Sequence, residues 1–240
     1  MTIRLLLLQA RYPGDPAKEE ERASFAARMG IPVDTIDSHD LLQGPPTISQ
    51  IQAYTALLIG GAGDFDVTKR NLPHFDSVLE VLAQVVEAGH PMFASCFGFQ
   101  MLVEALGGRI VRDEANMEVG TYRVYLTDAA QEDELFRILP TTFMAQEGHK
   151  ERAQVLPPGV IHLAYSDRVP YQAFRVPGKP IWATQFHPEL TGEDNRRRFE
   201  QYVRVYGQYM SEEELQERLR MFQPSPETEE ILPRFLDLIT

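Results

Sequence analysis

Cysteine is scarce in this sequence: Cys96 is the only one among 240 residues. A single thiol cannot form an internal disulfide, so a disulfide scaffold is excluded and a reducing compartment is favoured. We therefore expect a cytoplasmic protein.

Basic residues are also few. The chain has 23 Lys and Arg against 35 Asp and Glu, a formal net charge of -12. Nucleic-acid binding depends on clustered Lys and Arg, so the composition argues against a nucleic-acid partner. We interpret the acidity as favouring solubility, and it is compatible with a small-molecule substrate.

Apolar runs near the start are short. The four leucines of Leu5–Leu8 are too few for the core of a signal peptide and far too few to span a bilayer. We expect no membrane association, and we interpret this run as a buried first strand.

Apolar runs and helical patterns alternate through the first half. The predicted strands are Ile3–Leu8, Pro32–Ile36, Ala56–Ile59 and Pro91–Ala94. The predicted helices are Ala17–Met29 and a second with an apolar stripe from Phe75 to Val86, which Gly89 ends. This alternation predicts an α/β fold of three layers, a mainly parallel sheet with helices on both faces.

The second half has a different pattern. "YRVYLT", "YQAFRV" and "PIWATQF" alternate as antiparallel strands do, so we expect a mixed sheet. From Ser211 onward, two short amphipathic helices follow, with apolar faces at Leu215, Leu219 and Phe222 and at Ile231, Leu232, Phe235 and Leu236. We expect one domain over residues 1–240, with 207–240 as a helical extension packed on it. A dimer contact is the alternative for this tail.

Cys96 lies in "FASCFGFQML", where a predicted strand ends at Ala94 and a helix can begin near Gly98. A nucleophile on such a strand-to-helix turn is exposed at the carboxyl edge of the sheet. The helix N-terminus stabilises a thiolate there. The alternative is a buried structural cysteine, which the local pattern alone favours.

Two other segments supply what a thiolate nucleophile needs. His187 and Glu189, in "FHPE", follow another predicted strand, so the carboxylate can orient the imidazole as a base. The loop "GGAGDF" follows the Ala56–Ile59 strand, and its glycines let backbone amides approach a ligand. A surface histidine and an ordinary tight turn are the alternatives for these two segments.

In this order, "GGAGDF", "ASCFGFQ" and "FHPE" resemble the motifs of the class I glutamine amidotransferase family. "EVGTYRVYLT", "QEGHKERAQVLPPG" and "YQAFRV" are similar to further segments of that family, the second of them to its substrate loop. The resemblance covers residues 3–206. Ala94 stands where the family has glycine, and Lys150 and Glu151 stand where Gly-Asp is common.

The resemblance implies a flavodoxin-like class I glutaminase architecture and a role for each matching residue. Cys96 would be the nucleophile, His187 the base and Glu189 its orienting partner. Gly61 and Phe97 would donate oxyanion amides, with Gly63 beside them. Gln100 would contact bound glutamine, and His149 falls in the substrate loop without a catalytic role.

The implied reaction is hydrolysis of the glutamine side-chain amide through a cysteinyl thioester, which yields glutamate and ammonia without a metal or cofactor. The ammonia would serve a separate synthetase partner or be released. A γ-glutamyl peptide hydrolase with the same triad and a non-catalytic binding or regulatory homologue are the alternatives. The sequence leaves oligomerisation open.

Overall fold

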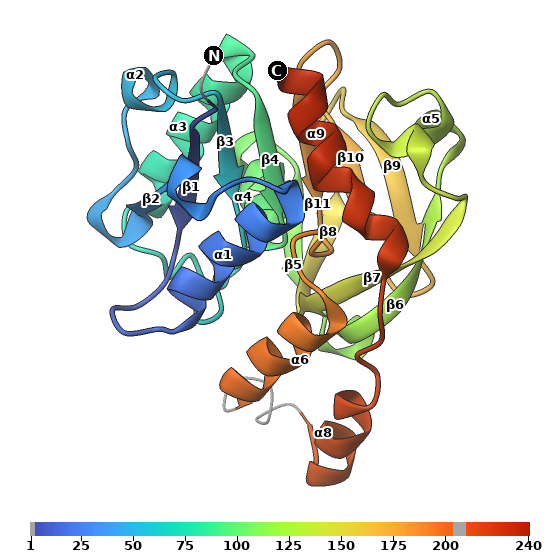
Figure 1. Ribbon diagram of the computed structural model, residues 1–240. Helices are drawn as coiled ribbons and strands as arrows, with labels where there is room; N and C mark the ends of the chain where they lie inside the picture. Colours follow the sequence, from blue (N-terminus) through green and yellow to red (C-terminus); the bar gives the residue numbers. More distant parts are fainter. Residues whose placement is uncertain (1–2, 204–209) are drawn as a thin grey trace.

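The computed structural model describes residues 3–203 and 210–240. In this part of the chain, a nine-stranded mixed sheet has the order β2-β1-β3-β4-β11-β10-β9-β6-β7 (Figure 1). Its strands are β1 Leu5–Gln9, β2 Ile36–Asp40, β3 Ala56–Ile59, β4 Met92–Ser95, β6 Glu118–Leu126, β7 Thr142–His149, β9 Ile161–Ser166, β10 Ala173–Arg175 and β11 Ile181–Thr184. A second sheet pairs β5 Arg109–Arg112 with β8 Glu151–Val155.

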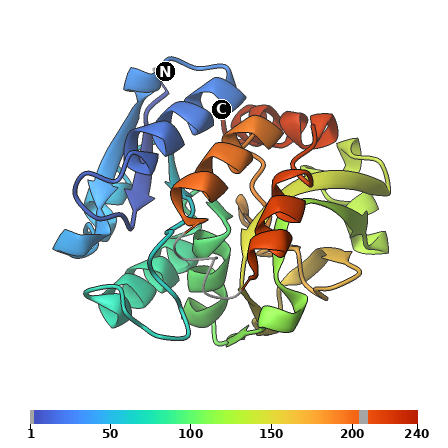
Figure 2. The same ribbon diagram turned by 90° about the horizontal axis from the view of Figure 1, so that it is seen from below.

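Helices cover both faces of the large sheet, which gives the predicted three layers (Figure 2). The helices are α1 Ala17–Met29, α2 Ile48–Ile51, α3 Phe75–Ala88, α4 Phe97–Ala105, α5 Asp128–Gln131, α6 Gly192–Gln201, α8 Glu212–Leu219 and α9 Ile231–Ile239. The apolar sides of α3 and α4 pack in one core cluster. Those of α1 and α9 pack in the other.

The parallel half of the sheet positions the site. Strands β2, β1, β3, β4 and β11 pair in parallel, in the flavodoxin-like order 2-1-3-4-5. The predicted α/β class is therefore confirmed. Parallel strands bring their carboxyl ends to one edge, where α/β proteins bind ligands near the point at which strand order reverses.

The antiparallel half agrees only in part with the sequence pattern. β6 and β10 have antiparallel neighbours throughout, as expected. The expectation for "PIWATQF" was wrong on one side, because β11 pairs in parallel with β4 and antiparallel with β10. β11 is buried along its whole length, as expected of a central strand covered on both faces.

Two further predictions needed correction. The strand predicted at Pro32–Ile36 forms at Ile36–Asp40, after a 3-10 turn at Val33–Thr35. This edge strand is only partly buried, so it accommodates polar residues. A prediction from apolar residues therefore placed the strand too early in the sequence. The segment matched to the substrate loop largely forms β7 and β8, with Lys150 between them.

The C-terminal helix α9 packs against the main core. Ile231, Leu232, Phe235 and Leu236 are buried in the cluster that contains α1 and the sheet. A 3-10 turn at Pro226–Glu230 precedes this helix, and α9 itself starts at Ile231. The predicted start of the extension, residue 207, lies outside the described residues.

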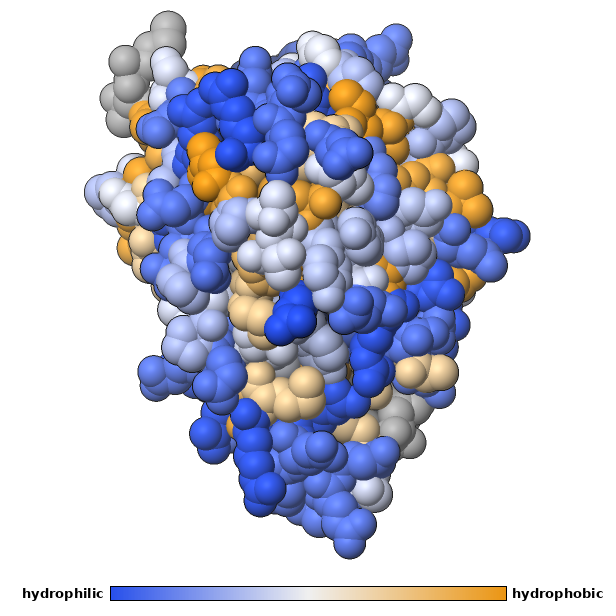
Figure 3. All heavy atoms as spheres, turned by 90° about the vertical axis from the view of Figure 1, so that its right-hand side faces the viewer, coloured by the Kyte–Doolittle hydropathy of each residue, from blue (hydrophilic) through white to orange (hydrophobic). Residues whose placement is uncertain are grey.

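Among residues 3–203 and 210–240, none of the helices has the length and apolar composition of a membrane span. Figure 3 shows the side of the molecule with β6, β9 and α5, where polar residues cover most of the face and apolar residues form separate patches. Such patches are usual on protein surfaces.

We expect Phe235→Ala to lower the free energy of unfolding by about 3–5 kcal/mol, because it leaves a cavity in the core. The Phe235 ring is fully buried between Phe93, at a centroid distance of 5.5 Å, and Trp182, at 6.0 Å. Denaturant unfolding measures the change. Asp237→Ala, at an exposed position of the same helix, is the matched control, and equal effects of the two variants would contradict the packing of α9.

Candidate active site

Cys96 occupies a sharp turn between β4 and α4. Its backbone has φ 52° and ψ -103°, a conformation that non-glycine residues rarely adopt. The amide of Cys96 donates to Thr184 O at 2.8 Å, and its carbonyl accepts from Gln100 N at 3.1 Å. The thiol residue is 8% exposed. The turn thus holds the sulfur at the carboxyl edge of the parallel strands.

Small residues let this turn pack against the glycine loop that follows β3. Gly98 N donates to Gly60 O at 3.1 Å. A Cβ atom on Gly98 would lie 2.7 Å from Ile59 O, closer than carbon and oxygen can pack. Ala94, the departure from the family motif, is fully buried in β4 opposite Ile59 and Ala183. Alanine is therefore accommodated there within the regular strand.

His187 and Glu189 lie just beyond β11, and the His187 side chain interacts with Cys96. His187 Nδ1 is 2.6 Å from Glu189 Oε1, and both residues are buried. Burial disfavours the imidazolium, but the Cys96 sulfur and the Glu189 carboxylate outweigh it and raise the pKa of His187 to about 10. At neutral pH the geometry therefore favours a protonated His187 between the sulfur and the carboxylate.

The structure corrects the prediction for Gly61. Its amide donates to Glu21 Oε1 at 3.0 Å, so this N–H is not free for an oxyanion. Glu21, fully buried on α1, also accepts from Arg11 Nη2 at 2.9 Å. Burial favours the neutral acid, but Arg11 and Arg198 outweigh it and lower the pKa of Glu21.

Phe97 and Gln100 lie on α4 beside the sulfur. Phe97 is the first residue of α4, where a helix leaves its N–H groups without intrahelical partners. Its amide stays our candidate oxyanion donor. Gln100 Nε2 donates to Glu151 O at 3.0 Å and to Gln185 Oε1 at 3.2 Å. The Gln100 amide nitrogen therefore holds the β7–β8 turn. The predicted contact of Gln100 with bound glutamine would have to come from another atom of this side chain or replace one of these hydrogen bonds.

Two cavities meet at Cys96. The first, here called the β7–β8 cavity, is lined by Cys96 and by Gly63, Phe65, Phe97, Gln100, His149 and Lys150 among others. The second, here called the α6 cavity, is lined by Cys96 and by Arg11, Gly61, His187, Asn195, Arg198 and Tyr202 among others. The thiol therefore has space on two sides, and most of the predicted site residues line the first.

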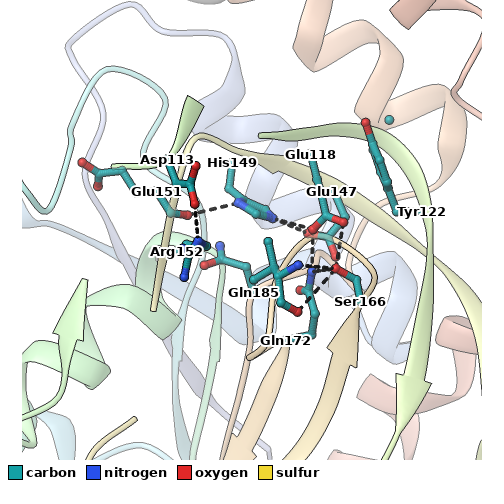
Figure 4. Close-up of polar contacts among 12 residues, drawn as sticks. Asp113, Glu118, Tyr122, Glu147, His149, Glu151, Arg152, Ser166, Gln172 and Gln185 are labelled. Atoms are coloured by element: carbon teal, nitrogen blue, oxygen red, sulfur yellow. Dashed lines mark hydrogen bonds and ion pairs between the residues drawn. The ribbon is translucent and has the colours of Figure 1, made fainter. Parts of the chain in front are cut away.

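Behind the β7–β8 cavity lies a buried charge network of Glu118, Glu147 and His149 (Figure 4). His149 Nε2 is 3.1 Å from Glu118 Oε2 and 3.3 Å from Glu147 Oε2. Burial opposes the charge on His149, but the two carboxylates raise its pKa to about 10. Burial raises the pKa of Glu147 to about 7, although His149 opposes the rise.

Carboxylate and imidazole atoms of these three residues lie within 4.8 Å of one another, close enough to share a metal ion. Glu118 is already engaged, because it accepts from Ser166 Oγ at 2.8 Å and from Gln172 Nε2 at 2.6 Å (Figure 4). His149 Nδ1 lies 3.0 Å from Glu151 O. A metal would have to displace these contacts, so we interpret the network as support for the β7–β8 turn.

Lys150 and Glu151, the other departures from the family motif, fasten that turn to the loop after β3. Lys150 Nζ is 2.9 Å from Asp66 Oδ1. The Glu151 carboxylate accepts from the amides of Val67 at 2.8 Å and Thr68 at 3.2 Å. Both side chains therefore position the wall of the β7–β8 cavity.

Several residues of the site were not predicted from the sequence: Arg11, Glu21, Glu118, Glu147, Gln185 and Arg198. Arg11 had a usable signal, since it closely follows β1 at the carboxyl edge of the sheet. Glu21 and Arg198 lie on helices rich in charged residues. Their sequence pattern resembles that of a solvated face, so nothing in it marked them.

Comparison with known proteins identifies the family. Residues 27–203 match the family model for glutamine amidotransferase class-I. A glutamine-hydrolysing GMP synthase subunit from Pyrococcus abyssi is 32% identical over 124 residues, which cover 50% of this chain and 64% of the relative. The corresponding Archaeoglobus fulgidus protein is 27% identical over 150 residues, covering 62% and 74%. The chain thus spans less than two thirds of the first of these relatives.

Solved structures share the fold. A glutamine amidotransferase from Thermotoga maritima superposes with a TM-score of 0.72 at 17% identity, covering 100% of this chain and 98% of the other. A glutamine amidotransferase from Methylobacillus flagellatus gives a TM-score of 0.67 at 18% identity, covering 99% and 95%. With the family match over 27–203, the conclusion is that this chain belongs to the class I glutamine amidotransferase family.

Proposed function

We propose that the protein hydrolyses the side-chain amide of glutamine, with Cys96 as nucleophile, His187 as acid and base, and Glu189 as the residue that orients His187. One observation carries the proposal: His187 lies between the Cys96 sulfur and Glu189, and both raise its pKa to about 10. A thiolate beside an imidazolium is the activated form of a cysteine nucleophile.

In the first half of the reaction, the Cys96 thiolate attacks the δ-carbonyl carbon of glutamine. The carbon–nitrogen bond then breaks, and His187 gives its proton to the departing nitrogen, which leaves as ammonia. The γ-glutamyl group stays on the sulfur as a thioester. We assign the β7–β8 cavity, which polar and backbone groups line beside Cys96, to its amino and carboxylate ends.

In the second half, neutral His187 takes a proton from water, whose oxygen attacks the thioester carbonyl. The carbon–sulfur bond breaks, and glutamate leaves. Cys96 returns as the thiolate and His187 as the imidazolium, so the starting ion pair is restored. Glu189 keeps its hydrogen bond to Nδ1 throughout and thereby directs Nε2 towards the reacting atoms.

The oxyanion of each tetrahedral intermediate needs backbone donors, a contribution that is often among the largest in acyl transfer. The Phe97 amide at the start of α4 is the donor we assign. The positive end of the helix dipole adds to the same stabilisation.

We further propose that the ammonia serves a separate synthetase partner. The support is the name of the curated relatives, which describes each of them as one subunit of a glutamine-hydrolysing GMP synthase. That the partner of this chain makes GMP is part of the same proposal.

Glutamate release from glutamine tests the catalytic role. We expect Cys96→Ala and His187→Ala to reduce kcat by about 10⁴-fold or more, as removal of a nucleophile or its base does in comparable enzymes. His39→Ala is the matched control, because it removes an imidazole from the edge strand β2. Glutamate release that survives in Cys96→Ala would refute the proposal.

We expect Glu189→Gln to lower the pKa of His187, because the variant removes one of the groups that oppose burial. The folded-state pKa lies above the unfolded value of about 6.5. The stabilisation is therefore fully present below about pH 6.5 and is lost as pH rises through about 10. In Glu189→Gln the loss moves to lower pH.

A histidine NMR titration follows this change, with His187→Ala to assign the signal. Glu193→Gln, at an exposed position of α6, serves as the control. An unchanged His187 titration in Glu189→Gln would show that the carboxylate does not support the imidazolium.

A further inference from the structure

The α6 cavity lies beside the sulfur and is distinct from the space assigned to the γ-glutamyl group. Only His187, Asn195, Arg198 and other residues of the α6 side belong to it alone, because it shares four lining residues with the β7–β8 cavity: Ala62, Gly63, Cys96 and Gly148. The scissile bond of an amide joins an acyl part to an amine part. When the acyl part occupies the β7–β8 cavity, the α6 cavity is therefore the space that remains for the amine part.

Arg198 is the notable group of this cavity. Arg198 is 9% exposed, and its Nη1 atom is buried without any hydrogen-bond partner among the described residues. A guanidinium has five N–H donors. An unpaired buried donor of a charged group is costly, so this side chain is suited to a ligand that brings an acceptor.

The nearby carboxylates do not supply that acceptor, because other groups already use them. Glu21 accepts from Arg11 and from the Gly61 amide. Asp15 accepts from the Tyr202 hydroxyl, from Arg11 at 3.5 Å and from the Ala17 amide. The charge of Arg198 still acts at longer range, since it helps to lower the pKa of Glu21.

The two arginines that precede Arg198 on α6 have partners. Arg196 Nε is 3.2 Å from Glu200 Oε1, and Arg197 Nη2 is 2.6 Å from Asp194 Oδ1. The side chains of Arg196 and Arg197 are about half exposed, at 54% and 50%. Of the three consecutive arginines, Arg198 therefore lines the cavity, and it has no paired carboxylate among the described residues.

We propose that the α6 cavity is a leaving-group subsite, and that Arg198 pairs there with the carboxylate of an amino acid joined through its amine to the γ-glutamyl group. A carboxylate matches the planar fork of a guanidinium and can accept two hydrogen bonds from it. The substrate class is thus γ-glutamyl amides of small amino acids. The proposal rests on the thioester mechanism proposed above.

The chemistry balances without any further reactant. The Cys96 thiolate attacks the γ-glutamyl carbonyl, the bond to the amine nitrogen breaks, and His187 protonates that nitrogen. Water then releases glutamate from the thioester, as with glutamine. The amino acid, its amino group now free, leaves from the α6 cavity.

Binding to the Cys96→Ala variant tests the subsite without turnover. Calorimetry compares γ-glutamylglycine and γ-glutamyl-β-alanine with their C-terminal amides, which lack the carboxylate charge. We expect at least one acid to bind about 10- to 100-fold more tightly than its amide, the size of a charge-assisted hydrogen bond. Adding Arg198→Gln removes the difference, whereas adding Arg196→Gln leaves it.

The acid-to-amide ratio within one variant cancels any loss of binding common to both ligands. Equal binding of every acid and its amide in Cys96→Ala, or no binding of either, overturns the subsite. A ratio that survives in Arg198→Gln overturns the role of Arg198. Absence of Cys96-dependent glutamate release from glutamine would instead overturn the proposed function, so the two failures are distinguishable.

Discussion

The positive φ angle of Cys96 determines where the nucleophilic sulfur lies. With φ at 52°, the chain turns from β4 directly into α4, and the thiol is held at the carboxyl edge of the sheet. Glycine would adopt this conformation more readily, but only cysteine supplies the nucleophile. The surrounding contacts hold the strained residue in place, through Thr184 on β11, Gly60 after β3 and the first turn of α4.

Buried charges position the loops around that turn. Glu21 on α1 holds the Gly61 amide, and Glu151 holds the amides of Val67 and Thr68. Each carboxylate replaces water as the partner of a backbone group that would otherwise be unsatisfied. The site therefore depends on charge pairs from α1 and β8 as much as on the residues that touch the sulfur.

The sequence predicted the parts of the fold that rest on local pattern. α1 matched its predicted limits, β3 matched residue for residue, and Gly89 ends α3 as expected. Edge strand β2 was misplaced, because half-buried polar residues give no apolar pattern. The pairing of Gly61 with Glu21 joins residues forty apart in sequence, so no local signal could predict it. Arg198 was missed for the same reason, since only the fold shows that one arginine of three faces inward.

The proposed function requires Cys96 to react with the γ-glutamyl group of glutamine. The most direct measurement is intact-protein and peptide mass spectrometry after treatment with 6-diazo-5-oxo-L-norleucine, an electrophilic glutamine analogue. We expect one adduct, on Cys96, which excess L-glutamine prevents and His187→Ala slows. An adduct elsewhere, or an unmodified Cys96 after complete exposure to the reagent, would contradict it.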